Sequence, residues 1–399
     1  MVHSDTRAEE KTFVTTQISV NESNTSWHFI RNVLVKAFLL FILLNLIFAL
    51  WYPLPTLGKV SFYNLVFPGR QRLPYGDNPD LAYNLSLFDL EAMFRSHEIS
   101  SGNKPANEYR VILIGDSSTW GFLLPTEETL TAKLNASKLQ LPDGRQVRAY
   151  NLGYPVMSLT KDLLMLSKAM AFEPDMIVWS ITLESFPTDK QLYPPILQHN
   201  PETVRALIDE YGLNLDPFSD DFVEVSIQDR TIIGARRSIA DLFRLQLYGV
   251  PWAATRIDQY IPDTFTPRIE DLDADDTFHE MVPPYLDAND LAMDVLSAGL
   301  VMSDDIPLII INEPMFVSQG KNSDIRYNFF YPRWAYDDYR ALIQQYSQEN
   351  DWYYFDMWDV VPSSEFTNSA VHLTAKGNEI LAQKVADAIM EVAQHDIAR

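Results

Sequence analysis

The stretch VILIGDSS, residues 111–118, decides the fold class of this chain. Four aliphatic residues in a row, ended by a glycine and then by polar residues, are typical of a strand that is buried on both faces of a parallel sheet. In an open sheet of this kind, ligands bind outside the carboxyl ends of the strands. The polar residues that follow the apolar run are therefore the first candidates for chemistry.

Further strands and helices are expected in alternation along the chain. The other predicted strands are Val147–Tyr150, Met176–Ile181, Ile306–Ile311 and Trp352–Phe355. Helical patterns fall at about 127–140, 158–172, 333–349 and 374–394. Strands that alternate with helices argue for a parallel sheet covered by helices on both faces. We therefore predict an α/β fold.

One segment near the N-terminus has the length and composition of a transmembrane helix. Val33–Tyr52 is interrupted only by Lys36 and Asn45, and roughly 20 apolar residues span a bilayer. Trp51 and Tyr52 lie where an interfacial aromatic belt is expected. Cations flank both sides in nearly equal number, Arg31 and Lys36 before Lys59, Arg70 and Arg72. We expect a single-pass anchor, with the N-terminus inside and the main domain extracytoplasmic, as is usual for signal anchors.

The expected organisation has five parts. They are a polar tail (1–31), the transmembrane anchor (32–52), a juxtamembrane segment (53–107), the main α/β domain (108–189 and 301–399) and an insertion (190–300). Within the insertion, residues 235–257 are basic and amphipathic in an otherwise acidic chain. This stretch is either an ordinary surface helix or one that meets a membrane or a partner.

Composition excludes several function classes. The formal net charge of −23 disfavours binding to nucleic acid phosphates. The absence of cysteine removes disulfides, thiol nucleophiles and thiolate metal sites. The acidic cluster at 270–276 lacks the spacing of a calcium loop, and no phosphate-cradling glycine loop is present. We expect neither a metal nor a cofactor.

Three polar blocks follow predicted strands or precede a helix, and they carry the candidate chemistry. Ser117, after Asp116, begins a helix, where backbone N–H groups favour an oxyanion. Asn151-Leu152-Gly153 ends the second strand, and the Gly153 N–H is a candidate second donor. His372 lies on a loop before the last helix, and a nucleophilic serine needs such a base within hydrogen-bond reach. Taken singly, each block is equally an ordinary cap, turn or surface residue.

In combination and order, these blocks resemble the SGNH/GDSL hydrolase family. The resemblance covers roughly residues 108–186 and 304–394. It implies a flavodoxin-like three-layer α/β/α fold and an activity among esterases, lipases, polysaccharide deacetylases and acyltransferases. It also implies Ser117 as nucleophile, Ser117 and Gly153 as oxyanion-hole donors, and His372 as base.

Two positions depart from the pattern of the family. Glu184 stands where the family has an asparagine that donates to the oxyanion, and an ionised glutamate cannot donate. Either Asn151 or Asn312 substitutes, or Glu184 stays protonated. Ser369 stands where the family has its aspartate, with Asn368 one residue earlier. A backbone carbonyl, Glu365 or Asp359 is then left to orient His372.

Asn312 and Glu313 follow the fourth strand, at the active end of the predicted sheet. They either line the substrate pocket and orient the nucleophile or a sugar, or they close a turn. We expect a membrane-anchored serine esterase or O-acyltransferase that acts on an acyl ester of an envelope glycan or lipid. The alternatives are a weak or inactive glycan-binding module and a partner subunit of a membrane acyltransferase that docks through 235–257.

Overall fold

The computed structural model describes residues 20–61, 64, 69–76, 87–255, 257 and 259–397. The chain divides into two compact units. One contains the long N-terminal helix together with Ser226–Ala235, and the other contains the chain from Pro53 to Val225 and from Arg236 onward.

The larger unit is built on a five-stranded parallel sheet with the order β2-β1-β3-β4-β5. The strands are β1 (Glu108–Ile114), β2 (Gln146–Asn151), β3 (Met176–Ile181), β4 (Leu308–Asn312) and β5 (Tyr353–Asp356). This is the strand order of flavodoxin-like folds, in which the order reverses between the first and third strands. The predicted parallel α/β sheet is confirmed, and each predicted strand is present within a few residues of its expected bounds.

Helices connect the strands and cover the sheet. They are α2 (Leu54–Gly58), α3 (Leu90–Ser96), α4 (Ser117–Trp120), α5 (Leu130–Ala136), α6 (Leu159–Ala169), α7 (Pro195–Gln198), α8 (Pro201–Tyr211), α9 (Arg236–Thr255), α10 (Met293–Ser303), α11 (Arg333–Glu349) and α12 (Ala375–Ile397). The N-cap residues of α3, α5 and α6 are Asp89, Thr129 and Ser158, and the side chain of each accepts a backbone N–H of the first helical turn. Such caps satisfy donors that the first turn of a helix leaves free.

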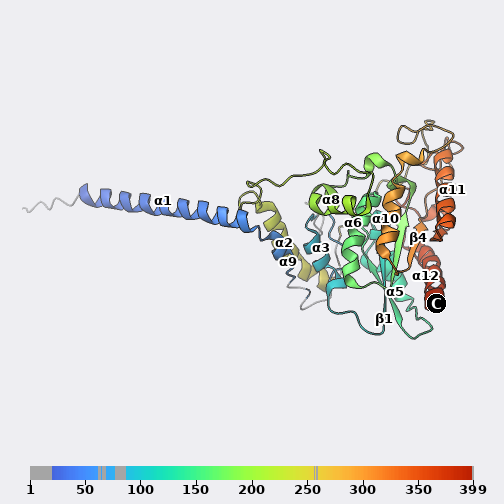
Figure 1. Ribbon diagram of the computed structural model, residues 1–399, viewed down its shortest axis with the longest axis horizontal. Coiled ribbons are helices and arrows are strands. Elements are labelled where there is room, and N and C mark those ends of the chain that lie inside the picture. The colour runs from blue at the N-terminus through green and yellow to red at the C-terminus, as the bar shows by residue number, and fades with distance from the viewer. Residues whose placement is uncertain are drawn as a thin grey trace, which may run out of the picture. The chain divides into compact units, whose positions relative to one another are not determined.

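The sheet separates two apolar cores because successive strand residues point to opposite faces. Ile112 and Ile114 of β1 pack in one core with residues of α6, α10 and α11. Val111 and Leu113 pack in the other core with residues of α5 and α12. In Figure 1, α6 and α10 lie together on one side of β4 and α12 lies on the other. The three-layer α/β/α arrangement follows.

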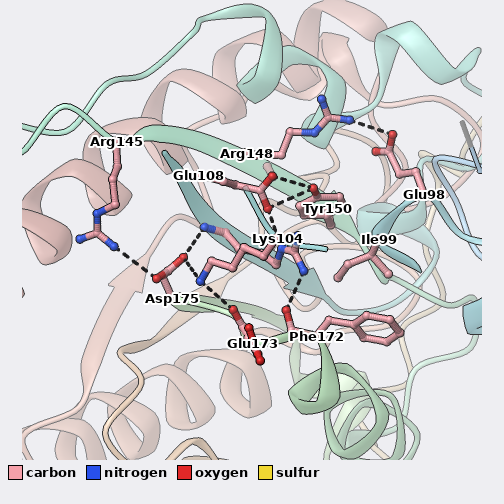
Figure 2. A network of polar contacts seen from close by, with 12 residues as sticks. Glu98, Ile99, Lys104, Glu108, Arg145, Arg148, Tyr150, Phe172, Glu173 and Asp175 are labelled. Atoms are coloured by element: carbon pink, nitrogen blue, oxygen red, sulfur yellow. Dashed lines mark hydrogen bonds and ion pairs between the residues drawn. The ribbon is translucent and has the colours of Figure 1, made fainter. Parts of the chain in front are cut away.

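A polar network ties together the amino ends of the first three strands (Figure 2). Asp175, just before β3, pairs with Lys104 and Arg145 and accepts the backbone N–H of Arg110 at 2.6 Å. The Tyr150 hydroxyl donates to Glu108 at 3.1 Å. The bonds of Asp175 fix the strands at the end opposite to Ser117.

The smaller unit contains α1 (Val20–Trp51). Ser26–Trp51 has a mean hydropathy of 2.7, and this is the one helix in the described part of the chain that is long and apolar enough to cross a membrane. Asn45 lies among its apolar residues and is buried. Its side-chain oxygen accepts the backbone N–H of Ile233 at 3.3 Å, within the same unit.

Some expected boundaries differ from the structure. Residues 20–31 were expected in a polar tail, but they belong to α1, which begins at Val20. The rest of the expected tail, 1–19, lies outside the described residues. The expected insertion ends at 300, which lies inside α10. Val295 and Leu296 of α10 pack in the same apolar core as Ile112 and Ile114 of β1. The juxtamembrane segment contains α3, a helix that was not predicted; Met93 and Phe94 are buried in the same core.

Candidate active site

The turn after β1 places Ser117 at the carboxyl edge of the sheet. Gly115 has φ of +153°, which favours glycine, and a Cβ atom there would collide with Thr119 and Ser180. Asp116 caps the next turn by accepting the Ser118 N–H at 2.7 Å. Ser117 is therefore the first residue of α4. Because α4 is a single turn, local N–H groups rather than a long helix dipole act at this position.

Ser117, His372 and Asn368 form a continuous chain of hydrogen bonds. The Ser117 Oγ lies 2.8 Å from the His372 Nε2, and the His372 Nδ1 lies 2.8 Å from the Asn368 Oδ1. An amide oxygen can only accept, so the His372 Nδ1 carries the proton and its Nε2 offers a lone pair to the serine hydroxyl. This is the tautomer that a base toward Ser117 requires.

Protein atoms around His372 keep its imidazole neutral. Burial lowers the pKa of His372 to about 4. The Phe122 ring stacks on the imidazole with the two centroids 4.8 Å apart. Glu365, expected as a possible orienting acid, instead accepts the Thr374 hydroxyl at 2.5 Å. The side chain of Asn368, rather than a backbone carbonyl, Glu365 or Asp359, orients the base.

Of the two backbone N–H groups expected to bind an oxyanion, those of Ser117 and Gly153, one already has an acceptor within the protein. No acceptor in the described chain binds the Ser117 N–H, so this group is free for a substrate oxygen. The Gly153 N–H instead donates to the Asn151 Oδ1 at 3.1 Å. A Cβ atom on Gly153 would lie 2.7 Å from the Trp120 nitrogen. The glycine thus lets the end of β2 approach α4 closely, and its role as a second donor stays a prediction.

Asn151 has no free amide N–H, because its Nδ2 donates to the Thr119 carbonyl at 2.9 Å and to the Trp120 carbonyl at 3.3 Å. It therefore joins β2 to α4 instead of replacing the missing family donor. The Asn312 Nδ2 donates one N–H to the Asp356 Oδ1 at 2.8 Å, and its oxygen lies 3.2 Å from the Tyr336 hydroxyl. A substitute-donor role for Asn312 stays a prediction.

Glu184 is ionised, so the expectation that it stays protonated is wrong. Burial alone would raise its pKa, but hydrogen bonds and charge from His279 and Lys190 outweigh burial and lower the pKa. The His279 Nε2 lies 3.2 Å from both carboxylate oxygens, and Lys190 forms an ion pair with the same group. The Glu184 hydrogen bond is in turn the main factor that raises the pKa of His279. The charge of Lys190 and the hydrogen bond with His279 offset the negative charge of Glu184.

A buried pair of carboxyl groups lies behind the nucleophile turn. Asp116 and Glu313 are almost fully buried. In the described chain, neither Glu313 oxygen, nor the Asp116 Oδ2, meets a donor in hydrogen-bonding geometry. Burial first, and then the charge of Asp116, raise the pKa of Glu313 well above its ordinary value. Burial also raises the pKa of Asp116. Two adjacent buried carboxyls cannot both ionise, so the pair keeps at least one proton.

Lys161 of α6 binds the backbone of the turn that carries Ser117. Its side chain is fully buried. The Nζ donates to the Gly115 carbonyl at 2.8 Å and to the Tyr154 carbonyl at 2.9 Å, and it pairs with Asp162. One cation therefore connects the residue before Asp116 with the residue after Gly153.

No protein-family model matches the chain, and no curated protein matches it. Among solved structures, an acetylxylan esterase of Geobacillus stearothermophilus, in a catalytic mutant form, matches with 12% identity and a TM-score of 0.35, over 70% of this chain and 94% of that one. A carbohydrate acetylesterase family member of Sinorhizobium meliloti matches with 14% identity and a TM-score of 0.30, over 73% and 99%. A candidate lipolytic protein of the G-D-S-L family from Desulfitobacterium hafniense matches with 12% identity and a TM-score of 0.30, over 70% and 99%.

The structure brings together Ser117, His372 and Asn368 at one edge of the sheet, with Asp116 and Glu313 behind them. A hollow lined by Trp352, Tyr353 and His395 lies instead at the amino end of β5, away from the nucleophile.

Two contributors to this candidate site carry no signal in the sequence. His279 lies in surroundings without a strand-end pattern, and its contact with Glu184 spans 95 residues of sequence. Lys161 is one lysine in an amphipathic helix, and no local signal distinguishes it from a surface lysine. In the described residues, no cluster of histidine and carboxylate side chains forms a metal site.

Proposed function

We propose that this chain is a membrane-anchored serine esterase or O-acyltransferase, with Ser117 as nucleophile and His372 as general base. The observation that carries the proposal is the unbroken hydrogen-bond chain from Ser117 through His372 to Asn368. Nucleophile, base and orienting group within hydrogen-bond reach are the recognisable feature of covalent acyl transfer. Half-buried Ser117 leaves room for a substrate carbonyl.

The proposed reaction has two stages. The Ser117 Oγ attacks the ester carbonyl carbon while its proton passes to the His372 Nε2, and the carbonyl oxygen becomes an oxyanion near the Ser117 N–H. When the tetrahedral adduct collapses, the ester C–O bond breaks and His372 returns the proton to the departing alcohol. Water then hydrolyses the acyl-enzyme, or a second hydroxyl group accepts the acyl group, with the proton again passing through His372.

This arrangement supports a slow catalyst in the isolated chain. Removing one oxyanion donor costs roughly 10²–10³ in turnover, and Glu184 cannot replace the missing amide. Asn368 fixes the tautomer of His372 but contributes no charge to stabilise the imidazolium. These two features also favour a second candidate, a weak or inactive glycan-binding module or partner subunit of a membrane acyltransferase.

The substrate class and location are part of the proposal. Following the family resemblance, the substrate is an acyl ester of an envelope glycan or lipid. The apolar helix α1 anchors the chain in the membrane, and the catalytic unit lies on the extracytoplasmic side, where such esters are found. Neither a metal nor a cofactor enters any step.

The test is active-site labelling of the full-length protein in detergent micelles. A fluorophosphonate is added, and intact mass is measured for the wild type, for Ser117→Ala and for Ser118→Ala, the matched control at the next serine. We expect one adduct on the wild type and on S118A, and none on S117A. If the wild type, folded by its circular dichroism, takes up no adduct, Ser117 is not activated and the binding-module candidate replaces the enzyme.

A further inference from the structure

Helix α9 exposes an apolar stripe that its own unit leaves uncovered. Phe243 is 67% exposed and Leu247 is 70% exposed, and Val250 is exposed beside them. These positions are spaced by four and three residues, so they share one face of the helix. Large apolar side chains on a single exposed face indicate a surface that meets something other than water.

Arginines border this stripe in a strongly acidic chain. The Arg237 side chain is 88% exposed and the Arg244 side chain is 56% exposed, and Arg236 begins the helix. The whole chain carries a formal charge of −23. An apolar face flanked by arginines is the composition of a helix that lies in the interface of an anionic membrane.

The opposite face holds α9 firmly on the larger unit. Leu245 and Trp252 are buried, and the Arg70 guanidinium lies over the Trp252 ring, 4.5 Å from its centroid. The Gln246 side chain donates to the Val60 carbonyl at 2.9 Å, and α9 packs against α2. The inner face is thus committed to the fold, and the stripe is free to bind a second surface.

In sequence, both points at which the chain passes between the two units adjoin α9 or the helix on which it packs. Only Tyr52 and Pro53 separate the end of α1 from the start of α2, the helix on which α9 packs. The segment just before α9 belongs to the same unit as α1: the Ile233 N–H binds Asn45, and the Arg230 guanidinium lies 5.1 Å from the centroid of the Tyr52 ring. Arg236, the first residue of α9, follows that segment directly.

We propose that the outer face of α9 binds the surface of an anionic phospholipid bilayer, on the side where α1 leaves the membrane. Phe243, Leu247 and Val250 enter the interfacial region, and the flanking arginines bind lipid phosphates. The proposal rests on the membrane anchoring given under the proposed function. Its consequence is that the catalytic unit is attached to the membrane at two points, so that the domain is held at the bilayer surface instead of rotating freely on a tether.

The absence of cysteine in the chain makes site-specific labelling direct. Full-length Leu247→Cys carries an environment-sensitive fluorophore and is reconstituted into vesicles of phosphatidylcholine and phosphatidylglycerol. Val301→Cys is the matched control, because Val301 is 68% exposed on α10. Quenching is measured with a nitroxide attached to the lipid chain and, separately, with aqueous iodide.

We expect the lipid nitroxide to quench the probe at position 247 several-fold more strongly than the probe at 301, and iodide to show the reverse. Adding R237E and R244E to L247C should remove that difference. Equal access of iodide to both probes overturns the proposal. Protection of 247 from iodide without quenching by lipid also overturns it, because a protein then covers the face. Failure of the wild type to float with the vesicles contradicts the anchoring itself, whereas fluorophosphonate labelling tests the enzymatic proposal independently.

Discussion

The Asn368 side chain accepts a hydrogen bond from the protonated Nδ1 of His372. An aspartate does the same in a Ser-His-Asp triad, but Asn368 carries no charge. An amide keeps the imidazole in the right tautomer as long as its oxygen faces the ring. The Thr367 hydroxyl, 3.3 Å from the same oxygen, supports that orientation. What the amide does not provide is stabilisation of the imidazolium, so His372 is a correctly placed but weak base.

Asn368→Asp should therefore activate the enzyme. A carboxylate next to an imidazole raises its pKa by roughly 1–3, and the stronger base should increase the rate of fluorophosphonate labelling near neutral pH roughly tenfold. The wild-type rate should fall only as the pH drops through about 4, because His372 must be neutral to accept a proton. In N368D this acid limb should move to higher pH. N368A is the control, and a rate equal for N368D and N368A would show that Asn368 does not orient the base.

The raised pKa of Glu313 predicts that the rate of fluorophosphonate labelling also declines at alkaline pH. A carboxyl whose pKa is raised by folding stabilises the protein fully below its ordinary value of 4.5, and this stability is lost as pH rises through the raised pKa. Loss of the proton leaves two charges side by side and disturbs the Asp116 cap under Ser117. Glu313→Gln keeps a donor toward Asp116 at every pH, so its labelling rate should stay constant where that of the wild type declines.

The control for this prediction is Glu313→Ala, which removes the donor altogether. It should be destabilised at all pH values, by about 1–3 kcal/mol for an unsatisfied buried acceptor, as measured by thermal unfolding in detergent. An alkaline limb in E313Q identical to that of the wild type would assign the limb to another group.

At the scale of elements, the sequence predicts regular structure well and long-range polar contacts poorly. The strands were found because a buried parallel strand is a continuous apolar run, as in Val111–Ile114. Helix α11 was predicted with its observed bounds, 333–349, because its apolar positions repeat at helical spacing. Ser117 and His372 were found because each lies at the end of a regular element, where local patterns change.

The missed parts share one physical cause, which is that their partners are distant in sequence. Helix α3 is short and lies in a proline-rich segment, and it is helical because Met93 and Phe94 pack into the core. His279 lies on a loop, and its significance comes from Glu184. Lys161 is identified only by the two carbonyls that it binds, Gly115 and Tyr154, which the fold brings together from the ends of β1 and β2.

The same contacts explain how elements position the nucleophile. Lys161 holds the ends of β1 and β2, and Asn151 joins the end of β2 to α4 through the Thr119 carbonyl. On the other side, the Trp120 indole donates to the Leu73 carbonyl at 2.9 Å. Residues just after the apolar helix thus pack against the turn that carries Ser117, and the juxtamembrane segment is part of the catalytic unit.

At the scale of the whole molecule, the fold buries two of the cations that follow the apolar helix in sequence, and this bears on the orientation of the chain in the membrane. Arg70 and Arg72, which follow the apolar helix in sequence, are buried. The Arg72 side chain donates to the Gly121 carbonyl at 2.9 Å, and Arg70 stacks on Trp252, so the fold accounts for both. Of the flanking cations, Lys59 remains after the helix, against Arg31 and Lys36 at its start. Counting only these sequence neighbours of the helix, the excess of cations expected on the cytoplasmic side agrees with the proposed orientation, with the N-terminus inside.

This topology is tested by labelling single cysteines from one side of the membrane. Val301→Cys, on the catalytic unit, should react with a membrane-impermeant maleimide in intact spheroplasts, because the proposed substrate is on the outer side. Ser4→Cys, which precedes the apolar helix, should react only after the membrane is permeabilised. The opposite pattern would place the catalytic unit in the cytoplasm, where envelope glycans are out of reach, and the substrate would then have to be an acyl ester of the inner leaflet or the cytosol. The two cysteines differ only in position, so the comparison needs no assumption about the activity of Ser117.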